Sequence, residues 1–475
     1  MTMSRDYDCL VLDDQASRYL DWWLRGKYTV NALREEDMIT TTWGLLGPEV
    51  LATERRTRTL GLNAAVRWFN DLAVPGLGGV WFGKQLFLAL LGIAVADRVR
   101  SLGHRVRNIE VANAVEALAC WLALNSTGWK SNPRLRGATK MRNKTDLAFA
   151  QMRKPSFYVT QPMRQATVQP LRAFGLVDSV GERFNAFICT QAGYDFITAT
   201  CGDLRPFNRS VVEHLVGWAM SAHDKVKTSW HLTTVLSPLG PMPAAARELL
   251  RERIVQGSGV EAIRRRKAMS WVEQLRDNPP QSIDWQAKPV ALDESHWRDL
   301  HAGALFFNVR DAAIRLLDQI ESHIANAPGQ QMSLDSRFPD PIRAKISLLR
   351  NFAHAFIENE YDPSPDREAT RFCRECSAQV DSEVLENLLA REGRVLRWCG
   401  RAILPGVAFR GFQVAQTETA RSPEEDGADV EIGTDLALPE GISYRVRNLY
   451  LLNLDLHAEL DNGLVAVADE GGDEQ

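Results

Sequence analysis

The chain has 475 residues and a mass of 53.3 kDa, enough for two or three domains of ordinary size. Hydrophobic residues make up 45% and charged residues 24% of it, which excludes a collagen-like, coiled-coil or wholly disordered chain. The net charge of −4 averages two opposed segments. Residues 130–172 hold ten Lys or Arg against one acidic residue, Asp146, whereas residues 415–475 hold fifteen acidic residues against three Arg.

Cysteine usage and hydropathy predict a cytoplasmic protein without membrane contact. Seven widely spaced cysteines are too few for a disulfide scaffold, and the polar residues 1–8 do not resemble a signal peptide. The most apolar run, Leu86–Ala96, has 11 residues, about half of the roughly 20 that span a bilayer, so we expect a buried helix there. Arg outnumbers Lys by 45 to 11, a bias typical of a bacterial, GC-rich genome.

The order of predicted elements indicates a mainly α fold in four regions. A helical N-terminal region (1–107) is interrupted by a Gly-rich break, Pro75–Gly83. A second region (108–205) opens with a helix over Ile109–Leu124, for which Asn108 is the expected cap, and continues into the basic stretch.

The remaining two regions are a helical domain (206–414) and an acidic linker and tail (415–475). In the former, the clearest helical patterns are Leu292–Asn326 and Pro341–Glu360, and Asp366–Ile403 is a further amphipathic helical stretch. In the latter, two short apolar runs within Ile442–Ala466 could be strands.

Residues 163–197 carry the most informative pattern. Leu171–Val177 reads as a helix that ends in Gly-Leu-Val, a β-hairpin is expected around Gly181–Arg183, and Thr190 can cap a helix that starts at Gln191. This order resembles the second half of a winged helix-turn-helix domain of bacterial regulators and condensin-type kleisin subunits, over about residues 108–201. The resemblance implies a recognition helix followed by a wing.

Pro170 lies inside the proposed recognition helix and should kink or shorten it, so the match is better for the wing than for base reading. We expect Arg164, Gln165, Thr167 and Gln169 to face a major groove and Arg183 to approach a minor groove or phosphate. The cations before and within the helix form the expected phosphate-binding stripe, and they are Lys130, Arg134, Arg136, Lys140, Arg142, Lys144, Arg153, Lys154, Arg164 and Arg172.

Other uses of this charge stay open at the sequence level. Winged helices also serve as protein-docking units, and a basic face can simply be solvated. The acidic residues 415–475 could dock on the basic stretch in place of DNA, or act as a solvating tail.

Two motifs suggest chemistry and are interpreted as structural. Gly78–Gln85 fits G-x-x-x-x-G-K but ends in Gln, which lacks the hydroxyl that holds Mg²⁺, so we predict a turn there. Cys373 and Cys376 could supply half a zinc site, but a second pair of ligands at suitable spacing is missing, and packing is the preferred interpretation. No catalytic residue, metal or cofactor is assigned.

The sequence therefore predicts a non-enzymatic DNA-binding or scaffold subunit of a multi-protein bacterial complex acting on double-stranded DNA, in a defence, condensin-like or mobile-element setting. The alternatives are a nuclease or nucleotide-using enzyme with dispersed acidic residues, and a transcriptional regulator.

Overall fold

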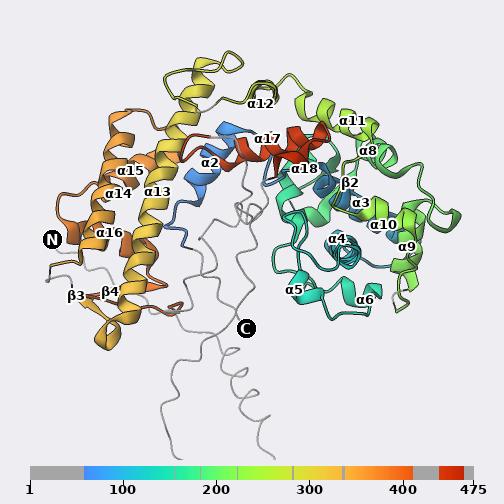
Figure 1. The fold of residues 1–475 in the computed structure, drawn as a ribbon, viewed down its shortest axis with the longest axis horizontal. Coiled ribbons are helices and arrows are strands. Elements are labelled where there is room, and N and C mark those ends of the chain that lie inside the picture. The colour runs from blue at the N-terminus through green and yellow to red at the C-terminus, as the bar shows by residue number, and fades with distance from the viewer. Residues whose placement is uncertain are drawn as a thin grey trace, which may run out of the picture. The chain divides into compact units, whose positions relative to one another are not determined.

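The structure is a computed structural model that describes residues 58–409 and 438–464, apart from 156, 182, 222, 281–282 and 334–336. These residues all belong to one compact unit, Thr53–Gln475, and they are mainly α-helical, as the sequence predicts (Figure 1). The α-helices are α2 (Asn63–Ala73), α3 (Gly83–Ser101), α4 (Asn108–Ser126), α5 (Ala138–Met141), α6 (Phe149–Met152), α7 (Val168–Ala173), α8 (Gln191–Cys201), α9 (Val211–Ser221), α10 (Trp230–Leu236), α11 (Ala244–Val255), α12 (Val260–Asp277), α13 (Glu294–Asn326), α14 (Asp340–Glu358), α15 (Glu368–Cys376), α16 (Asp381–Glu392), α17 (Tyr444–Leu456) and α18 (Leu460–Gly463). The 3₁₀ turns are η1 (Met163–Thr167), η2 (Phe184–Ala186), η3 (Pro206–Asn208), η4 (Pro328–Gln330) and η5 (Pro365–Arg367), and the strands are β1 (Val177–Ser179), β2 (Phe187–Cys189), β3 (Met332–Ser333), β4 (Leu396–Cys399) and β5 (Ala402–Pro405).

A first hydrophobic core is built around α3 and α4, which pack against each other along their lengths. Gly92 allows this, because a Cβ there would lie 2.5 Å from the Ala112 Cα, which is closer than atoms can approach. Leu86–Ala96 is buried along α3, which confirms the expected core helix. Among the residues that the structure describes, no helix is long and apolar enough to cross a membrane.

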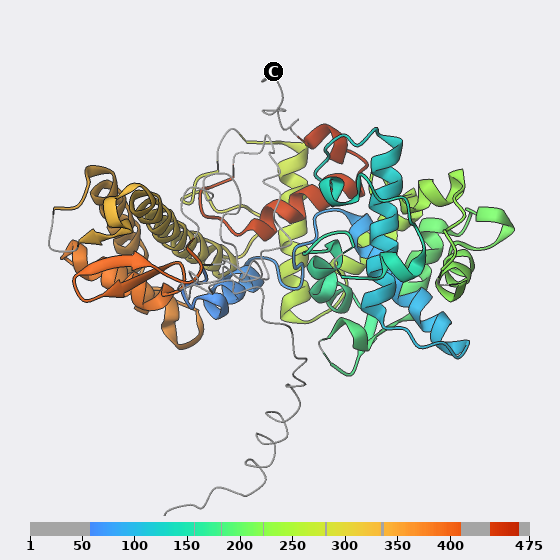
Figure 2. The same cartoon turned by 90° about the horizontal axis from the view of Figure 1, so that it is seen from below.

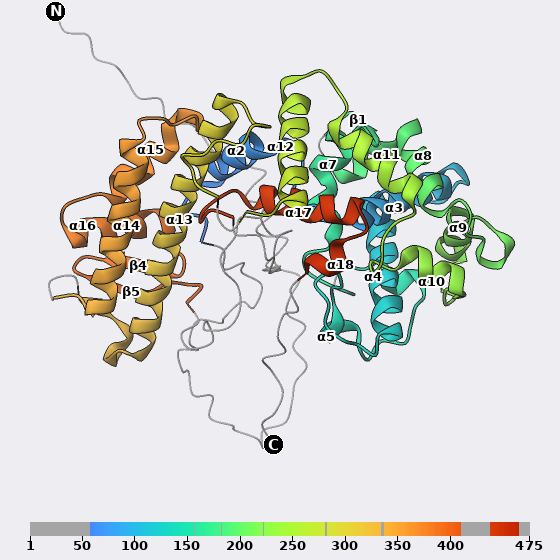
Figure 3. The same ribbon diagram turned by 45° about the horizontal axis from the view of Figure 1, so that its top comes forward.

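Helix α17 corrects one expectation for the C-terminal region. Within the range expected to hold two strand-like runs, residues 444–456 form a helix, Tyr444–Leu456, which packs on α12 and also contacts α2, α3 and α11 (Figure 3). The end of that range, residues 465–466, lies outside the described residues. Leu449, Leu451 and Leu452 are at most 1% exposed in the first core. This part of the acidic region is therefore an integral part of the fold. Residues 415–437 and 465–475 lie outside the described residues.

A second hydrophobic core is formed by α2 and most of α13 with α14, α15, α16 and a three-stranded antiparallel sheet of order β3-β5-β4, and strands β4 and β5 are the orange arrows in Figure 2. The two long helices of this core, α13 and α14, begin and end within two residues of the bounds expected from the sequence. The helical stretch expected over Asp366–Ile403 is divided into α15 and α16 and ends at Glu392, after which the chain continues into strands β4 and β5. Gly400 adopts a positive φ of 65° in the turn that joins them, a conformation that glycine takes without strain.

Candidate nucleic-acid interface

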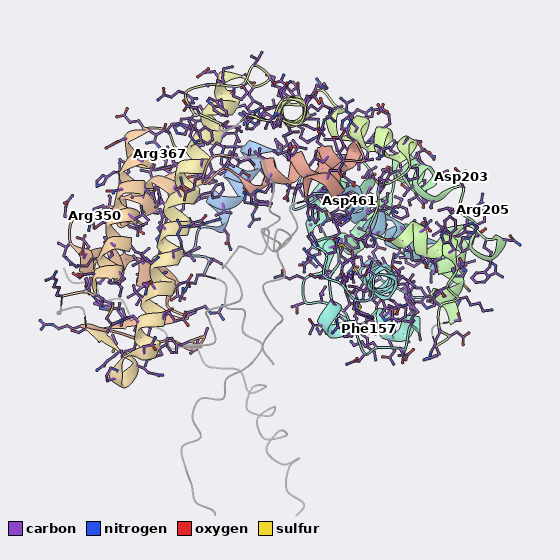
Figure 4. All side chains as sticks on the ribbon, viewed as in Figure 1. Phe157, Asp203, Arg205, Arg350, Arg367 and Asp461 are labelled. Carbon is purple, nitrogen blue, oxygen red and sulfur yellow. The ribbon has the colours of Figure 1, made fainter. Side chains whose placement is uncertain are left out.

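The basic segment (residues 130–154) is folded onto α4. Asn113, in the middle of α4, donates from its side-chain amide to the Met152 and Lys154 carbonyls at 2.9 and 3.0 Å. Trp121 donates from Nε1 to the Lys144 carbonyl at 2.9 Å. Met141, Phe149 and Met152 are at most 1% exposed and anchor the short helices α5 and α6 in the first core. This anchoring fixes the backbone from which the cations project. Phe157, just beyond the segment, is labelled in Figure 4.

The predicted site residues fall into three groups by exposure. Among the cations, Arg136, Lys144 and Arg153 are half-buried. Three predicted contacts, Arg134, Arg164 and Thr167, are buried. The exposed residues are Lys130, Lys140, Arg142, Lys154, Gln165, Gln169, Arg172 and Arg183.

The half-buried cations lie among aromatic rings and carbonyls. The Lys144 ammonium lies 4.2 Å from the Phe157 ring centroid and donates to the Phe157 carbonyl. Partial burial, and next the charge of Lys140, lower the pKa of Lys144. Arg136 donates to the Gln161 carbonyl at 2.7 Å, and Nη1 of Arg153 lies 4.0 Å from a Glu110 carboxylate oxygen.

The three buried residues are committed to contacts inside the protein. Arg134 forms an ion pair with Asp461 of α18, so the acidic C-terminal region does meet the basic segment at one described position. Arg164 donates to the Asn113 side chain at 3.0 Å, and the Thr167 hydroxyl donates to the Arg164 carbonyl at 2.8 Å. A contact with phosphate or base requires an exposed donor, so we leave these residues out of the interface proposed below.

The elements expected for a wing are formed locally. Strands β1 and β2 pair antiparallel, with Val177 opposite Cys189. Gly175 adopts a φ of +65° where α7 ends, and Thr190 caps α8 by accepting a hydrogen bond from the Gly193 amide at 3.1 Å. Arg183 lies exposed in the connection between the strands. Asn108 does not cap α4; it is the first helical residue, and its amide instead ties α4 to the hairpin through the Phe184 and Phe187 carbonyls.

Helix α7, the expected recognition helix, has only six residues and follows a 3₁₀ turn, which agrees with the shortening expected from Pro170. Other segments hold it in place. Gly78 lies where a Cβ would be 2.9 Å from the Pro170 ring, Arg253 donates to the Phe174 carbonyl at 2.8 Å, and Gln169 bonds both Asp71 and Arg445. A helix this short and this closely held does not present the exposed face that a major groove accepts.

A buried acid lies beneath the basic segment. Glu116 of α4 is 0% exposed, and neither carboxylate oxygen has a hydrogen-bond partner among the described residues. The nearest paired cation is Arg164, whose Nη1 lies 3.9 Å from Oε2. Burial raises the pKa of Glu116 to about 7, although the charges of Arg164 and Arg136 act to lower it.

The Gly-rich motif forms a turn whose amides are occupied. Gln85, at the position where a phosphate loop has Ser or Thr, accepts from the Trp81 and Phe82 amides at 2.9 and 3.3 Å. The Gly83 amide donates to Asp455 at 2.8 Å. Lys84 is 5% exposed and donates to the Val235 carbonyl at 2.6 Å. Burial lowers the pKa of Lys84 to about 8. In this arrangement neither the amides nor the lysine is available to a nucleotide.

Cys373 and Cys376 lie on α15 with both thiols fully buried in the second core. Burial raises the pKa of both thiols well above the usual value. The described residues contain no group of three or more His, Cys, Asp or Glu arranged to hold a metal ion. The geometry therefore favours packing for this pair.

Sequence reasoning did not identify the residues that position the basic segment. Asn113 and Asn108 bond the basic segment and the hairpin to the buried helix α4, and no local pattern announces either role. The available signal was an asparagine among the apolar residues of a core helix, since a buried amide needs hydrogen-bond partners.

Comparison with family models, with curated proteins and with solved structures gives no match for this chain.

Proposed function

We propose that this chain is a non-enzymatic DNA-binding or scaffold subunit of a bacterial assembly that acts on double-stranded DNA. The proposed contact surface consists of the exposed cations of the basic segment, together with Arg183 of the hairpin. The observation that carries the proposal is the exposure of Lys130, Lys140, Arg142 and Lys154 on a segment with a single acidic residue. Cations fixed on anchored backbone bind a phosphate array at low entropic cost, because little chain must be ordered on binding.

This surface is proposed to bind the DNA backbone without reading bases. Of the four side chains expected to read bases, Arg164 and Thr167 are buried, Gln169 is exposed but bonded to Asp71 and Arg445, and Gln165 is exposed. Among the cations expected to bind phosphate, Lys130, Lys140, Arg142 and Lys154 are exposed, so most of the exposed predicted contacts are phosphate-binding ones. Phosphate contacts position a protein on duplex DNA and carry no sequence information directly. The proposal is thus a sequence-tolerant DNA contact, which suits a scaffold subunit better than a transcriptional regulator.

Fluorescence anisotropy with a 20-base-pair duplex tests the proposal. Changing Lys130, Lys140, Arg142 and Lys154 together to Ala should weaken binding about tenfold or more at moderate salt, equally for unrelated sequences. The matched control changes four exposed arginines to Ala and alters the net charge by the same amount. These arginines lie on or beside the elements that build the second core, and they are Arg367, Arg374, Arg397 and Arg401. Equal losses of duplex affinity in both variants would show that the effect comes from net charge alone. That result would contradict the assignment of the contact surface to the basic segment.

The enzyme alternative is tested with the same preparation. Metal-dependent cleavage of DNA or steady turnover of ATP by the purified full chain would favour it. We expect neither. For ATP, the reason is that the motif Gly78–Gln85 has its lysine and the amides of Trp81 and Gly83 engaged within the fold.

A further inference from the structure

Two aromatic side chains stand exposed beside α9 and α10. Phe207 is 53% exposed and Trp230 is 73% exposed. Phe207 adopts a φ of +52° and Asn208 a φ of +64°, and two successive non-glycine residues in this region of backbone space are costly. The fold therefore accepts strain in the turn that directs an apolar ring toward solvent.

Both rings are supported by histidines and tied to each other. The Phe207 ring stacks on His214 with a centroid distance of 5.5 Å and an interplanar angle of 18°. Trp230 lies 5.4 Å from the neighbouring His231, whose Nδ1 is 3.2 Å from the Arg205 carbonyl. Because Arg205 is two residues from Phe207, this bond links the two aromatic positions. This bond and the packing of α10 against η3 place the two aromatic residues on neighbouring elements.

Arg205 and Arg209 flank Phe207 in the chain, and Nε2 of His214, on which the Phe207 ring stacks, lies 2.8 Å from the Lys227 carbonyl. Lys225 pairs with Ala148 in an antiparallel bridge, and the Val226 amide lies 3.5 Å from the Leu147 carbonyl, so residues 225–227 run beside α6. Figure 4 labels Asp203 and Arg205 at this end of the molecule. The exposed cations are Arg205, Arg209, Lys225 and Lys227, and the exposed acids are Asp203, Glu213 and Asp224.

One of these acids, Glu213, stabilises the start of α9. Glu213 accepts from the Ser210 amide and hydroxyl at 3.0 and 2.9 Å, where α9 begins. These bonds, and the charges of Arg205 and Arg209, lower the pKa of Glu213. Arg209 directly precedes Ser210 in the chain, so a cation lies where α9 begins.

We propose that this aromatic surface (Arg205, Phe207, Arg209, Lys225, Lys227 and Trp230) binds single-stranded DNA. Bases stack on the Phe207 and Trp230 rings, and the cations contact the phosphates between them. A duplex hides the faces of its bases, so the rings distinguish an unpaired strand from the duplex bound by the basic segment. The choice of DNA over RNA rests on the proposed function, whereas the single-strand assignment rests on the rings and cations alone.

Binding of a labelled 15-nucleotide oligo(dT) to the full chain tests this proposal. Phe207→Ala and Trp230→Ala should each weaken binding about tenfold, as expected for loss of one stacked base, and Trp230→Phe should retain most of the affinity. A strand of the same length with abasic sites should bind the wild-type protein weakly. Its affinity should be close to that of oligo(dT) for the double variant, in which Phe207 and Trp230 are both changed to Ala. Photo-crosslinking of an oligonucleotide that contains bromodeoxyuridine should label Phe207, Trp230 or both.

The matched control is Trp398→Ala, which removes another exposed tryptophan (50%, against 73% for Trp230) from β4 and should leave oligo(dT) binding unchanged. Retained far-ultraviolet circular dichroism identifies variants that still fold. Oligo(dT) affinity within twofold of wild type in the folded double variant, or equal losses for duplex and single strand, would overturn the proposal. Tighter binding of oligo(U) than of oligo(dT) would overturn the choice of DNA.

The two proposals fail separately. If the basic-segment variant keeps full duplex affinity while the ring variants lose oligo(dT), the proposed function falls and the single-strand site stands. If the ring variants keep oligo(dT) affinity while the basic-segment variant loses the duplex, the single-strand site falls and the proposed function stands.

Discussion

Gln169 of α7 accepts a hydrogen bond of 2.9 Å from Nη2 of Arg445, 276 residues later in the chain. Arg445 is 2% exposed and also pairs with Asp71 at 2.5 Å. The pair joins the short helix expected to read DNA to a helix in the acidic C-terminal region. It explains why α7 is held within the fold and why that region cannot be treated as a detachable tail.

Arg445→Ala should lower the free energy of unfolding by about 3 kcal/mol, because it leaves Asp71 and the Val74 carbonyl without their buried partner. Urea denaturation followed by tryptophan fluorescence measures the change. The control is Arg142→Ala, an exposed arginine whose removal should cost less than about 0.5 kcal/mol. A loss for Arg445→Ala no larger than that of the control would show that the buried pair does not stabilise the fold.

Truncation tests the structural role of α17. A chain that stops after Val414 loses α17, and with it several fully buried leucines, each worth about 2–5 kcal/mol. Because domains are stable by only about 5–15 kcal/mol, this chain should fail to fold. A chain that stops after Leu464 should keep the thermal midpoint of the full protein. Equal midpoints for both truncations would contradict the structural role of α17.

Glu116 predicts a pH-dependent stability. Its pKa is about 7 in the folded protein against an ordinary 4.5, so the folded state holds a proton that the unfolded state releases. The contribution is fully present below pH 4.5 and is lost as the pH rises through 7. Glu116→Gln should therefore raise the free energy of unfolding at pH 8 by about 2 kcal/mol relative to wild type, and by little at pH 4.5. A stability difference that does not change with pH would show that Glu116 is not the titrating group.

Lys84→Met tests the interpretation of the Gly-rich turn. Burial holds the pKa of Lys84 near 8, below the ordinary 10.5, so the charged amine opposes folding below pH 8 and this penalty disappears as the pH rises toward 10.5. Methionine keeps the length of the lysine side chain and removes its charge. Because Lys84 is buried, duplex affinity should stay within about twofold of wild type. Isothermal titration with ATP provides the second measurement, and nucleotide binding that disappears in the variant would contradict a structural turn.

Local signals in the sequence predicted the elements whose formation depends on nearby residues. Pro170, Gly175 and Thr190 shorten α7, end it and start α8, because a missing amide, a positive φ and a side-chain cap act within a few residues. Helix α17 was missed because it is buried on several sides, and a helix without a polar face loses the 3.6-residue pattern. Strands β4 and β5 were missed although Gly400 marks their turn.

In the candidate site too, features set by nearby residues could be predicted, and features set by distant partners could not. Exposure of several phosphate-binding cations follows from their number, since residues 130–172 hold ten basic residues and a fold cannot bury them all. Which of them are buried depends on partners far away in the chain: Arg134 pairs with Asp461, and Arg164 bonds Asn113. Such long-range pairing leaves no pattern in neighbouring residues. The exposed rings of Phe207 and Trp230 were missed for a related reason, because an aromatic residue in a helical pattern is usually part of the core.

The salt dependence of duplex binding tests the central claim most directly. Affinity measured between 50 and 300 mM salt should fall with a log–log slope of about −0.9 for each phosphate contacted. For the variant that lacks Lys130, Lys140, Arg142 and Lys154, the slope should be shallower than that of wild type by about 3 to 4. Equal slopes for the two proteins, or a wild-type affinity that does not depend on salt, would contradict the assignment of the basic segment as the DNA-binding surface.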